Sequence, residues 1–395
     1  MGLIEYVERR NTDCYKWDGL ESSFGRKDLL PMWVADMDFR IPGCVSKSLK
    51  EYIDLGVFGY HYPPAAYYDA FISWERKYHG YEVRREWMRF SPGVVPAFNW
   101  LVQILTKEGE AVAVMPPVYY PFMHAVDNNG RRLVKCPLLL TEAGYVMDHE
   151  AFEETIVRED VKAFIFCSPH NPVGRVWKKE EIRRMLDICK NHGVYVISDE
   201  IHHDLIMSGH EHVPAAIAGD IPGSYDDILV TLTAATKTFN LASVHNSIVI
   251  IPDESIRAKW DKFVECIRTG AGNAFGFIAV QAAYEEGRPW LEELLAVIED
   301  NYKYMRGRLE AGLPEVRVAD LEGTYLMWID LSAYMDPEKL RNGGMQHLME
   351  DVCGIAVDYG AWFGGDEYAG CIRVNLATSR ENIEYAADRI ISALK

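Results

Sequence analysis

The chain has 395 residues, of which 49% are apolar and 25% are charged, a balance typical of globular proteins with more than one hydrophobic core. Its formal net charge of -18 disfavours general binding to nucleic acids or anionic membranes, and no segment has the apolar length of a membrane span or signal peptide. The eight cysteines are scattered without the close spacing of a metal or redox pair, so we expect reduced thiols in a cytoplasmic protein.

The first forty or so residues are rich in proline and aromatic side chains and show no alternation of strand and helix patterns. The first clear helix signal with a functional meaning is the segment SPGVVP at residues 91–96. Backbone amides at the start of such a helix can bind phosphate, although one glycine at this place is weak support.

From about residue 90, short β-rich runs alternate with amphipathic segments. The runs lack polar alternation, which indicates strands covered on both faces and therefore a largely parallel sheet flanked by helices. These runs cover residues 111–115, 161–166, 193–198, 228–232 and 247–251. The fold class is therefore α/β, and functional groups should collect at the carboxyl ends of the strands.

Three polar residues follow successive strands of this pattern, namely Asn171, Asp199 and Lys237. Taken singly, they could be a turn asparagine, a helix cap and a surface lysine. Together they supply an amide, a carboxylate and an amine from the same kind of strand end. A lysine that forms a Schiff base with an aldehyde cofactor, beside a carboxylate that keeps a pyridine nitrogen protonated, is the protein's part in pyridoxal-phosphate chemistry.

The remainder of the chain has a mixed pattern that predicts a smaller α+β domain. The expected elements are a helix after residue 277, interrupted at 287–289 and resuming to about 309, β-rich segments at 323–330 and 370–376, a helix over 337–353, and a last helix from 379. We expect a large domain over residues 41–288, and a small domain that joins residues 1–40 to residues 289–395.

Arg373 lies among apolar residues on the expected strand at 371–375. An arginine that faces inward from such a strand needs an anion, and the carboxylate of an amino acid is a suitable bidentate partner. A structural salt bridge is the alternative.

From Pro31 to Arg380 the chain resembles fold-type I pyridoxal-phosphate enzymes, in particular the MalY/PatB branch of C–S β-lyases beside the class I/II aminotransferases. The motifs that carry the resemblance are PMWVADMDF (31–39), SPGVVPA (91–97), SDEIH (198–202) with HVP (212–214), KTFNLA (237–242), WLEEL (290–294), EGTYL (322–326) and IRVNLA (372–377).

The resemblance implies that the cofactor is pyridoxal 5'-phosphate and gives each matching residue a role. Lys237 would hold the cofactor and then act as general base on the substrate α-carbon, and Asp199 would pair with the pyridinium nitrogen. Asn171 would hydrogen-bond the phenolic oxygen of the ring, and Tyr119 would stack on the ring face. His202 would lie near the ring without a role in proton transfer.

Further roles concern the phosphate and the substrate. The backbone at Val94 and Val95 would cradle the phosphate, and Tyr60 would reach it from the neighbouring subunit. This implies a homodimer with active sites at the subunit interface. Arg373 would bind the substrate α-carboxylate, while Trp33 and Ala35 belong to a segment that covers the substrate.

Two positions depart from the family pattern. Ala234 stands where a phosphate-binding serine is common, so Thr233 or Thr236 would supply the hydroxyl, Thr236 being the better candidate. His245 stands in a segment that differs from the family and would either contact the phosphate or be structural.

The MalY-type motifs favour β-elimination from cystathionine or cysteine-type thioethers to a thiol, pyruvate and ammonia. A pyridoxal-phosphate-dependent aminotransferase acting on an L-amino acid is the alternative, because both reactions use the same lysine, aspartate, asparagine and arginine. A regulatory role through binding of another protein is a more remote alternative, and no DNA-binding segment or basic tail is visible.

Overall fold

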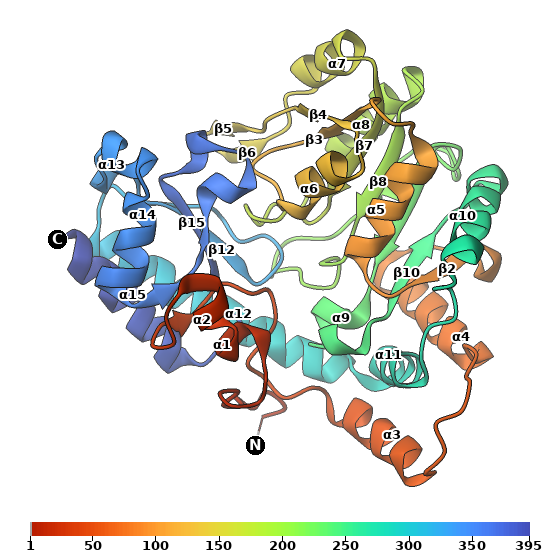
Figure 1. The fold of residues 1–395 in the computed structure, drawn as a ribbon, viewed down its shortest axis with the longest axis horizontal. Coiled ribbons are helices and arrows are strands. Elements are labelled where there is room, and N and C mark those ends of the chain that lie inside the picture. Colours follow the sequence, from red (N-terminus) through yellow and green to blue (C-terminus); the bar gives the residue numbers. More distant parts are fainter. Residues whose placement is uncertain (1) are drawn as a thin grey trace.

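The computed structural model describes residues 2–395, and its largest sheet has seven strands in the order β2-β10-β9-β8-β7-β3-β4 (Figure 1). These strands are β2 (Met88–Ser91), β3 (Ala111–Val114), β4 (Arg132–Lys135), β7 (Val161–Cys167), β8 (Tyr195–Asp199), β9 (Leu229–Thr233) and β10 (Ser247–Ile250). Strand β10 is antiparallel to both its neighbours, and the other six share one direction. The predicted α/β fold with a mostly parallel central sheet is confirmed.

The strands of this sheet bury both of their faces. In β7, Phe164 and Phe166 enter one apolar core, whereas Ile165 and Cys167 enter the core on the opposite face. The apolar runs in the sequence therefore have a direct cause, because a strand covered twice needs no polar side. One face is covered by α5 (Val94–Leu105), α6 (Pro121–Asn128) and α10 (Glu254–Ile267), and the other contacts α7 (His149–Arg158) and α8 (Lys179–Asn191).

A second, antiparallel sheet has four strands in the order β11-β12-β15-β14. They are β11 (Arg317–Val318), β12 (Leu326–Asp330), β14 (Asp358–Tyr359) and β15 (Cys371–Asn375). Helices α12 (Arg288–Gly312) and α15 (Arg380–Leu394) pack on each other beside it (Figure 1). Helix α11 (Ala274–Glu286) ends before Gly287, and Pro289 lies in the first turn of α12, where its missing N–H costs nothing. The predicted interruption is thus present.

The N-terminal segment contains α1 (Tyr15–Asp18), α2 (Leu20–Phe24) and β1 (Leu30–Pro31), and β1 pairs in parallel with β13 (Ile355–Ala356). Helix α3 (Gly43–Asp54) follows and packs on α11 at the edge of the molecule (Figure 1). Within residues 2–395, no helix combines the length and apolar character that crossing a bilayer requires.

The single helix predicted over residues 337–353 is wrong. The structure has α13 (Pro337–Arg341), α14 (Gly344–His347) and the π-helical turn η6 (Leu348–Cys353) instead. Gly343 adopts a φ of 78°, a left-handed conformation that is open to glycine and ends a helix. The sequence does carry a local signal for this break, the turn residues Asn342, Gly343 and Gly344, which the single-helix prediction overlooked.

Candidate active site

The three polar residues that the sequence singled out lie at neighbouring strand ends. Asn171 follows β7, Asp199 is the last residue of β8, and Lys237 lies in the short helix α9 (Ala235–Thr238) directly after β9. Because β7, β8 and β9 are adjacent and parallel, their carboxyl ends form one continuous edge. The sheet topology therefore brings these side chains to one place.

The amine of Lys237 lies in a poorly hydrated environment. Its Nζ donates a hydrogen bond of 2.6 Å to the carbonyl oxygen of Ala35. Burial lowers the pKa of Lys237 to about 8, and the nearby Arg373 charge acts in the same direction, against the carboxylates of Asp36 and Asp199. An amine with this pKa is partly neutral near pH 8 and can act as a nucleophile or a base.

The carboxyl group of Asp199 lacks a strong partner. The residue is 4% exposed, and its Oδ1 accepts a hydrogen bond of 3.1 Å from the backbone N–H of Ile201. Burial raises the pKa of Asp199 to about 7. A cationic N–H donor placed against this carboxylate would remove the cost of its ionisation, which is the property that a pyridinium nitrogen offers.

Arg373 joins the second sheet to this edge. It is 3% exposed, its Nη1 donates to Oδ1 of Asn171 over 2.9 Å, and its Nη2 donates to the carbonyl oxygen of Trp33 over 3.0 Å. Nη2 also forms an ion pair with Asp358, which stands opposite Arg373 in the β14–β15 register. The arginine faces inward as expected, and the salt bridge considered as an alternative is present.

Several buried polar atoms near this edge have no hydrogen-bond partner. Among residues 2–395 they include Oγ of Ser168, Nδ1 of His202 and Nε of Arg373. Buried polar atoms in native proteins are nearly always paired, so unpaired atoms gathered at one place indicate a polar ligand. Together with the buried carboxyl of Asp199, they fit a group that carries both anionic and hydrogen-bonding functions.

His202 and Tyr325 border the lysine. The two rings meet edge to face with centroids 5.8 Å apart, and the Tyr325 hydroxyl donates over 2.8 Å to the same Ala35 carbonyl that Lys237 contacts. Burial lowers the pKa of His202 well below its usual value, with Lys237 and Arg373 adding to the effect. The imidazole is therefore neutral at physiological pH and cannot supply a cationic acid.

The backbone N–H groups at the start of α5 have no capping side chain. They lie at the same edge of the sheet as Lys237, because α5 follows β2 and β2 runs in the same direction as β9. The N-cap residue is Gly93, which provides no side-chain hydrogen bond, and Pro96 has no N–H of its own. The N–H groups of Val94 and Val95 are thus the donors available in the first turn. Such donors, together with the helix dipole, attract a phosphate group.

The hydroxyl groups near Lys237 differ in their availability. Thr233 places its Oγ1 2.9 Å from Nδ1 of His203, so this hydroxyl is engaged away from α5. Ala234 is 2% exposed and caps α9 without a side-chain bond. Thr236 remains the better hydroxyl candidate of the two threonines. His245 is exposed and has a φ of 49° at the end of a short 3-10 turn.

Other residues from the sequence analysis lie at different distances from this centre. Tyr119 donates its backbone N–H to the Asn171 carbonyl over 3.0 Å, and burial raises the pKa of its phenol. Tyr60 is fully exposed, in the stretch before α4 (Ala65–Trp74), and is not brought to the site within one chain. The indole of Trp33 donates to the carbonyl of Lys16 over 3.0 Å, so only the Trp33 carbonyl reaches Arg373.

Three residues at the site were not among the predicted ones. They are Asp358, Tyr325 and Asn375, whose Nδ2 donates to the carbonyl oxygens of Val34 and Asp36 over 2.7 and 2.6 Å. Tyr325 and Asn375 stand in the EGTYL and IRVNLA motifs, so a signal for them existed. Asp358 stands in a two-residue strand without any motif, and its role depends on the register with β15.

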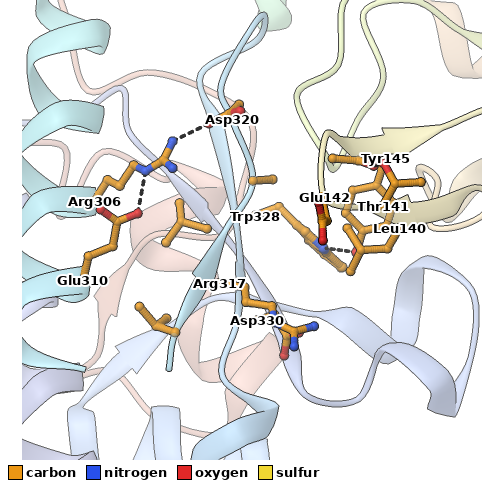
Figure 2. Close-up of a pocket in the computed structure, with 14 residues that line it drawn as sticks. Leu140, Thr141, Glu142, Tyr145, Arg306, Glu310, Arg317, Asp320, Trp328 and Asp330 are labelled. Atoms are coloured by element: carbon orange, nitrogen blue, oxygen red, sulfur yellow. Dashed lines mark hydrogen bonds and ion pairs between the residues drawn. The ribbon is translucent and has the colours of Figure 1, made fainter. Parts of the chain in front are cut away.

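The cavity shown in Figure 2 lies elsewhere and has a volume of about 720 Å³. It opens between the hairpin of β5 (Leu139–Thr141) and β6 (Gly144–Val146), helix α12 and strands β11 and β12. Arg306 bonds to both Glu310 and Asp320 at its rim (Figure 2). None of the predicted site residues lines this cavity.

The fold and the strand-end site agree with comparisons to known proteins. Residues 36–390 match the family described as "Aminotransferase class I and II", and the chain therefore belongs to that family. It is 41% identical to "Cystathionine beta-lyase PatB" of Bacillus subtilis (strain 168), over 100% of both chains. These findings confirm the resemblance to the MalY/PatB branch.

Two solved structures superpose on nearly the whole chain. Cystalysin from Treponema denticola, which contains a pyridoxal 5'-phosphate cofactor, is 34% identical with a TM-score of 0.92, covering 99% of this chain and 98% of that one. The PLP-bound C–S lyase from Staphylococcus hominis is 32% identical with a TM-score of 0.90, covering 99% of this chain and 97% of that one.

Proposed function

We propose that this protein is a pyridoxal 5'-phosphate-dependent C–S β-lyase, which converts cystathionine or a cysteine-type thioether and water to a thiol, pyruvate and ammonia. The observation that carries the proposal is the amine of Lys237, held by the Ala35 carbonyl, and the buried carboxyl of Asp199, bonded to the Ile201 N–H, at one sheet edge. The full-length similarity to a cystathionine β-lyase and to PLP-bound C–S lyases supports the reaction and the cofactor.

The residues at the strand ends would hold the cofactor as follows. Lys237 would bind its aldehyde carbon, Asp199 its ring nitrogen and Asn171 its phenolic oxygen, with Tyr119 against the ring face. The phosphate would lie at the start of α5, held by the residues that are free to donate there, namely Val94, Val95 and Thr236. When bound, the cofactor supplies an electron sink that makes the substrate α-proton acidic.

Lys237 would remove that α-proton. A general base works best when its pKa lies near the operating pH, and burial brings the pKa of Lys237 to about 8. His202 stays neutral and has no proton to give from a charged form, so it would shape the site. Departure of the sulfur from the β-carbon then depends on how the substrate side chain is held.

Arg373 would orient the substrate through its α-carboxylate. Within residues 2–395 its Nε has no hydrogen-bond partner, while Nη1 and Nη2 are fixed by Asn171, Trp33 and Asp358. A guanidinium held in this way keeps its plane constant and offers directed donors to an incoming carboxylate. The carbonyl of Ala35, which Lys237 contacts, belongs to the segment that would cover the bound substrate.

An aminotransferase reaction on an L-amino acid is the second candidate, favoured by the description of the family. Supplying L-cystathionine without any keto acid and measuring pyruvate separates the two reactions. A lyase releases pyruvate and a thiol under these conditions. Turnover that appears only after a keto acid is added would reject the lyase and support the aminotransferase.

We also propose that the enzyme is a homodimer. The loop between α3 and α4 exposes apolar side chains that a monomer would leave in water, Tyr60 being fully exposed. The members of this exposed stretch are Leu55, Val57, Phe58, Tyr60 and Tyr62. Covering them with a second subunit would place Tyr60 near the partner's phosphate site.

We further propose that the protein is cytoplasmic and that its chain forms a large and a small domain. All eight cysteines are free, which supports a reducing, cytoplasmic environment.

A large domain over residues 41–288 is supported by the seven-stranded sheet, which lies within that range. The pairing of β1 with β13 supports joining residues 1–40 to residues 289–395 in the small domain.

A further inference from the structure

A buried cluster of two histidines and two carboxylates lies beside the strand end that carries Asp199. Glu75 and His79 come from the π-helical turn η1 (Glu75–His79), and His203 and Asp204 come from the turn after β8. One donor atom each from Glu75, His79 and His203 lies within 4.8 Å of the others. We call these four residues the carboxylate–histidine cluster.

Three donor atoms of the cluster, one each from Glu75, His79 and His203, lie close enough together to bind one metal ion. Nε2 of His203 is 3.1 Å from Glu75 Oε1 and 3.5 Å from Asp204 Oδ2. Nε2 of His79 is 2.8 Å from Asp204 Oδ1. Bonds of about 2.0–2.1 Å in a tetrahedral shell place neighbouring donors about 3.3 Å apart, which is close to the separation of Glu75 and His203.

His203 is oriented so that its Nε2 faces both carboxylates of the cluster. Its Nδ1 lies 2.7 Å from the carbonyl oxygen of Glu200 and 2.9 Å from the hydroxyl of Thr233, and the carbonyl can only accept a hydrogen bond. Nε2 is therefore the ring nitrogen that faces Glu75 and Asp204, and a metal ion bound there would take the place of its proton.

The charges of the two carboxylates in the cluster also favour a bound cation. Glu75 and Asp204 are 3% and 5% exposed, and within residues 2–395 their only ion-pair partners are histidines, not lysines or arginines. Buried carboxylates are stable only when paired with a cation or bound to a metal. A divalent ion would neutralise both of them in one step.

Supporting hydrogen bonds hold the cluster in the way that outer-sphere groups hold metal ligands. The Nδ1–H of His203 bonds to the Glu200 carbonyl, a contact typical of metal-bound histidines. Asp204 accepts hydrogen bonds of 2.8 Å from Trp74 Nε1 at Oδ1 and from Thr238 Oγ1 at Oδ2. The carboxylate is therefore oriented before any ion arrives.

We propose that the carboxylate–histidine cluster is a structural site for a divalent first-row metal ion, with Zn²⁺ as the ion best suited to its nitrogen and oxygen donors. The ligands would be Glu75, His79 and His203, of which Glu75 and His203 are buried, and Asp204 contacts both histidines. Thr238 neighbours Lys237, and His203 follows Asp199 in the same loop. The ion would tie η1 to both segments that carry active-site residues.

Metal analysis of the purified holoenzyme tests this site independently of the lyase reaction. The protein is expressed without a histidine tag in zinc-supplemented medium, dialysed into metal-free buffer and analysed by plasma mass spectrometry. We expect about one Zn²⁺ per chain in the wild type. Glu75→Gln and His203→Gln should retain almost none, whereas His192→Gln, an exposed histidine paired with Glu153, should retain the wild-type amount.

X-ray absorption at the zinc edge of the wild type gives a second reading that does not depend on variants. The expected shell contains nitrogen and oxygen only, at about 2.0–2.1 Å. A shell that contains sulfur would place the ion at a cysteine and overturn the proposal. Wild-type protein that carries no zinc, and whose Tm does not rise with added Zn²⁺, would also overturn the proposal. The cluster would then be held together by hydrogen bonds alone.

Discussion

Arg373 donates a hydrogen bond of 2.9 Å from Nη1 to the side-chain oxygen of Asn171, a residue 202 positions away in the sequence. This contact joins β15 of the four-stranded sheet to the loop after β7 of the seven-stranded sheet. The residue proposed to bind the substrate and the residue proposed to contact the cofactor ring are therefore parts of one network. A donor group held in place before binding loses less entropy when the ligand arrives.

The pair of Arg373 and Asp358 gives a stability prediction. Asp358 is 1% exposed, so Arg373→Met leaves a carboxylate buried without its cation. We expect a loss of about 3–5 kcal/mol in the free energy of unfolding at pH 8, measured by urea denaturation. Adding Asp358→Asn should recover part of this loss. Equal stability of the single and double variants would contradict a direct coupling.

Conservative replacement of the same arginine tests its role in binding. Arg373→Lys keeps the positive charge but removes the planar fork that fits a carboxylate. We expect the KM for L-cystathionine to rise by about tenfold or more, on the scale of one charged hydrogen bond. Arg308→Lys, a change at an exposed salt bridge, serves as the control and should leave KM unchanged.

Asp199→Asn should affect stability and cofactor binding in opposite directions. In the cofactor-free protein, the pKa of Asp199 is raised by burial to about 7, so its ionisation becomes costly as the pH rises from about 4 to 7. The variant should therefore be more stable than wild type at pH 8, by up to about 4 kcal/mol, and equal to it below about pH 4.

The same variant should bind the cofactor more weakly, because asparagine cannot balance a cationic ring nitrogen. Thermal unfolding across pH measures the first effect, and titration with pyridoxal 5'-phosphate measures the second. Asp227→Asn, at an exposed ion pair with Lys190, is the matched control for both. Unchanged cofactor affinity in Asp199→Asn would reject the proposed pairing.

The first turn of α5 gives a test of the phosphate site. Val94→Pro removes one backbone N–H at a position where helices accept proline, and the preceding Gly93 is already extended, with ψ 163°. We expect an affinity for pyridoxal 5'-phosphate about tenfold lower or weaker still, as for the loss of one hydrogen bond to a charged group. Val94→Ala loses the side chain but keeps the amide, so it should bind the cofactor nearly as wild type does.

Mixed dimers test whether Tyr60 serves the partner's site. Tyr60→Ala and Lys237→Ala should each be nearly inactive as homodimers. In a mixed dimer, one site would combine Lys237 of the first subunit with Tyr60 of the second, so about half of the wild-type activity per dimer should return, as expected for a site shared by symmetry-related subunits. If mixing restores nothing, although the two chains exchange, Tyr60 does not act across the interface.

Much of the site was predictable because it depends on local patterns and a simple topological rule. Apolar runs followed by Asn171, Asp199 and Lys237 place these residues at the carboxyl ends of adjacent parallel strands. The start of α5 at Val94 was visible from the glycine and prolines around it. These features need no knowledge of how distant segments pack.

The parts that the sequence did not reveal depend on tertiary packing. Asp358 meets Arg373 only through the register of a strand two residues long, too short for any periodic pattern. The indole of Trp33 turns toward Lys16 because Tyr15 and Phe24 pack on it, each with a ring centroid 5.0 Å away. The break at Gly343 is different, because the local sequence Asn342-Gly343-Gly344 does signal a turn there.

The most direct test of the proposed site is the covalent attachment of the cofactor to Lys237. The holoenzyme is treated with borohydride, which makes the link permanent, and the digested protein is analysed by mass spectrometry. The account predicts the mass of the reduced cofactor on the peptide containing Lys237, and on no other lysine. A cofactor mass on a different lysine, or Lys237→Ala protein that still acquires it, would contradict the account.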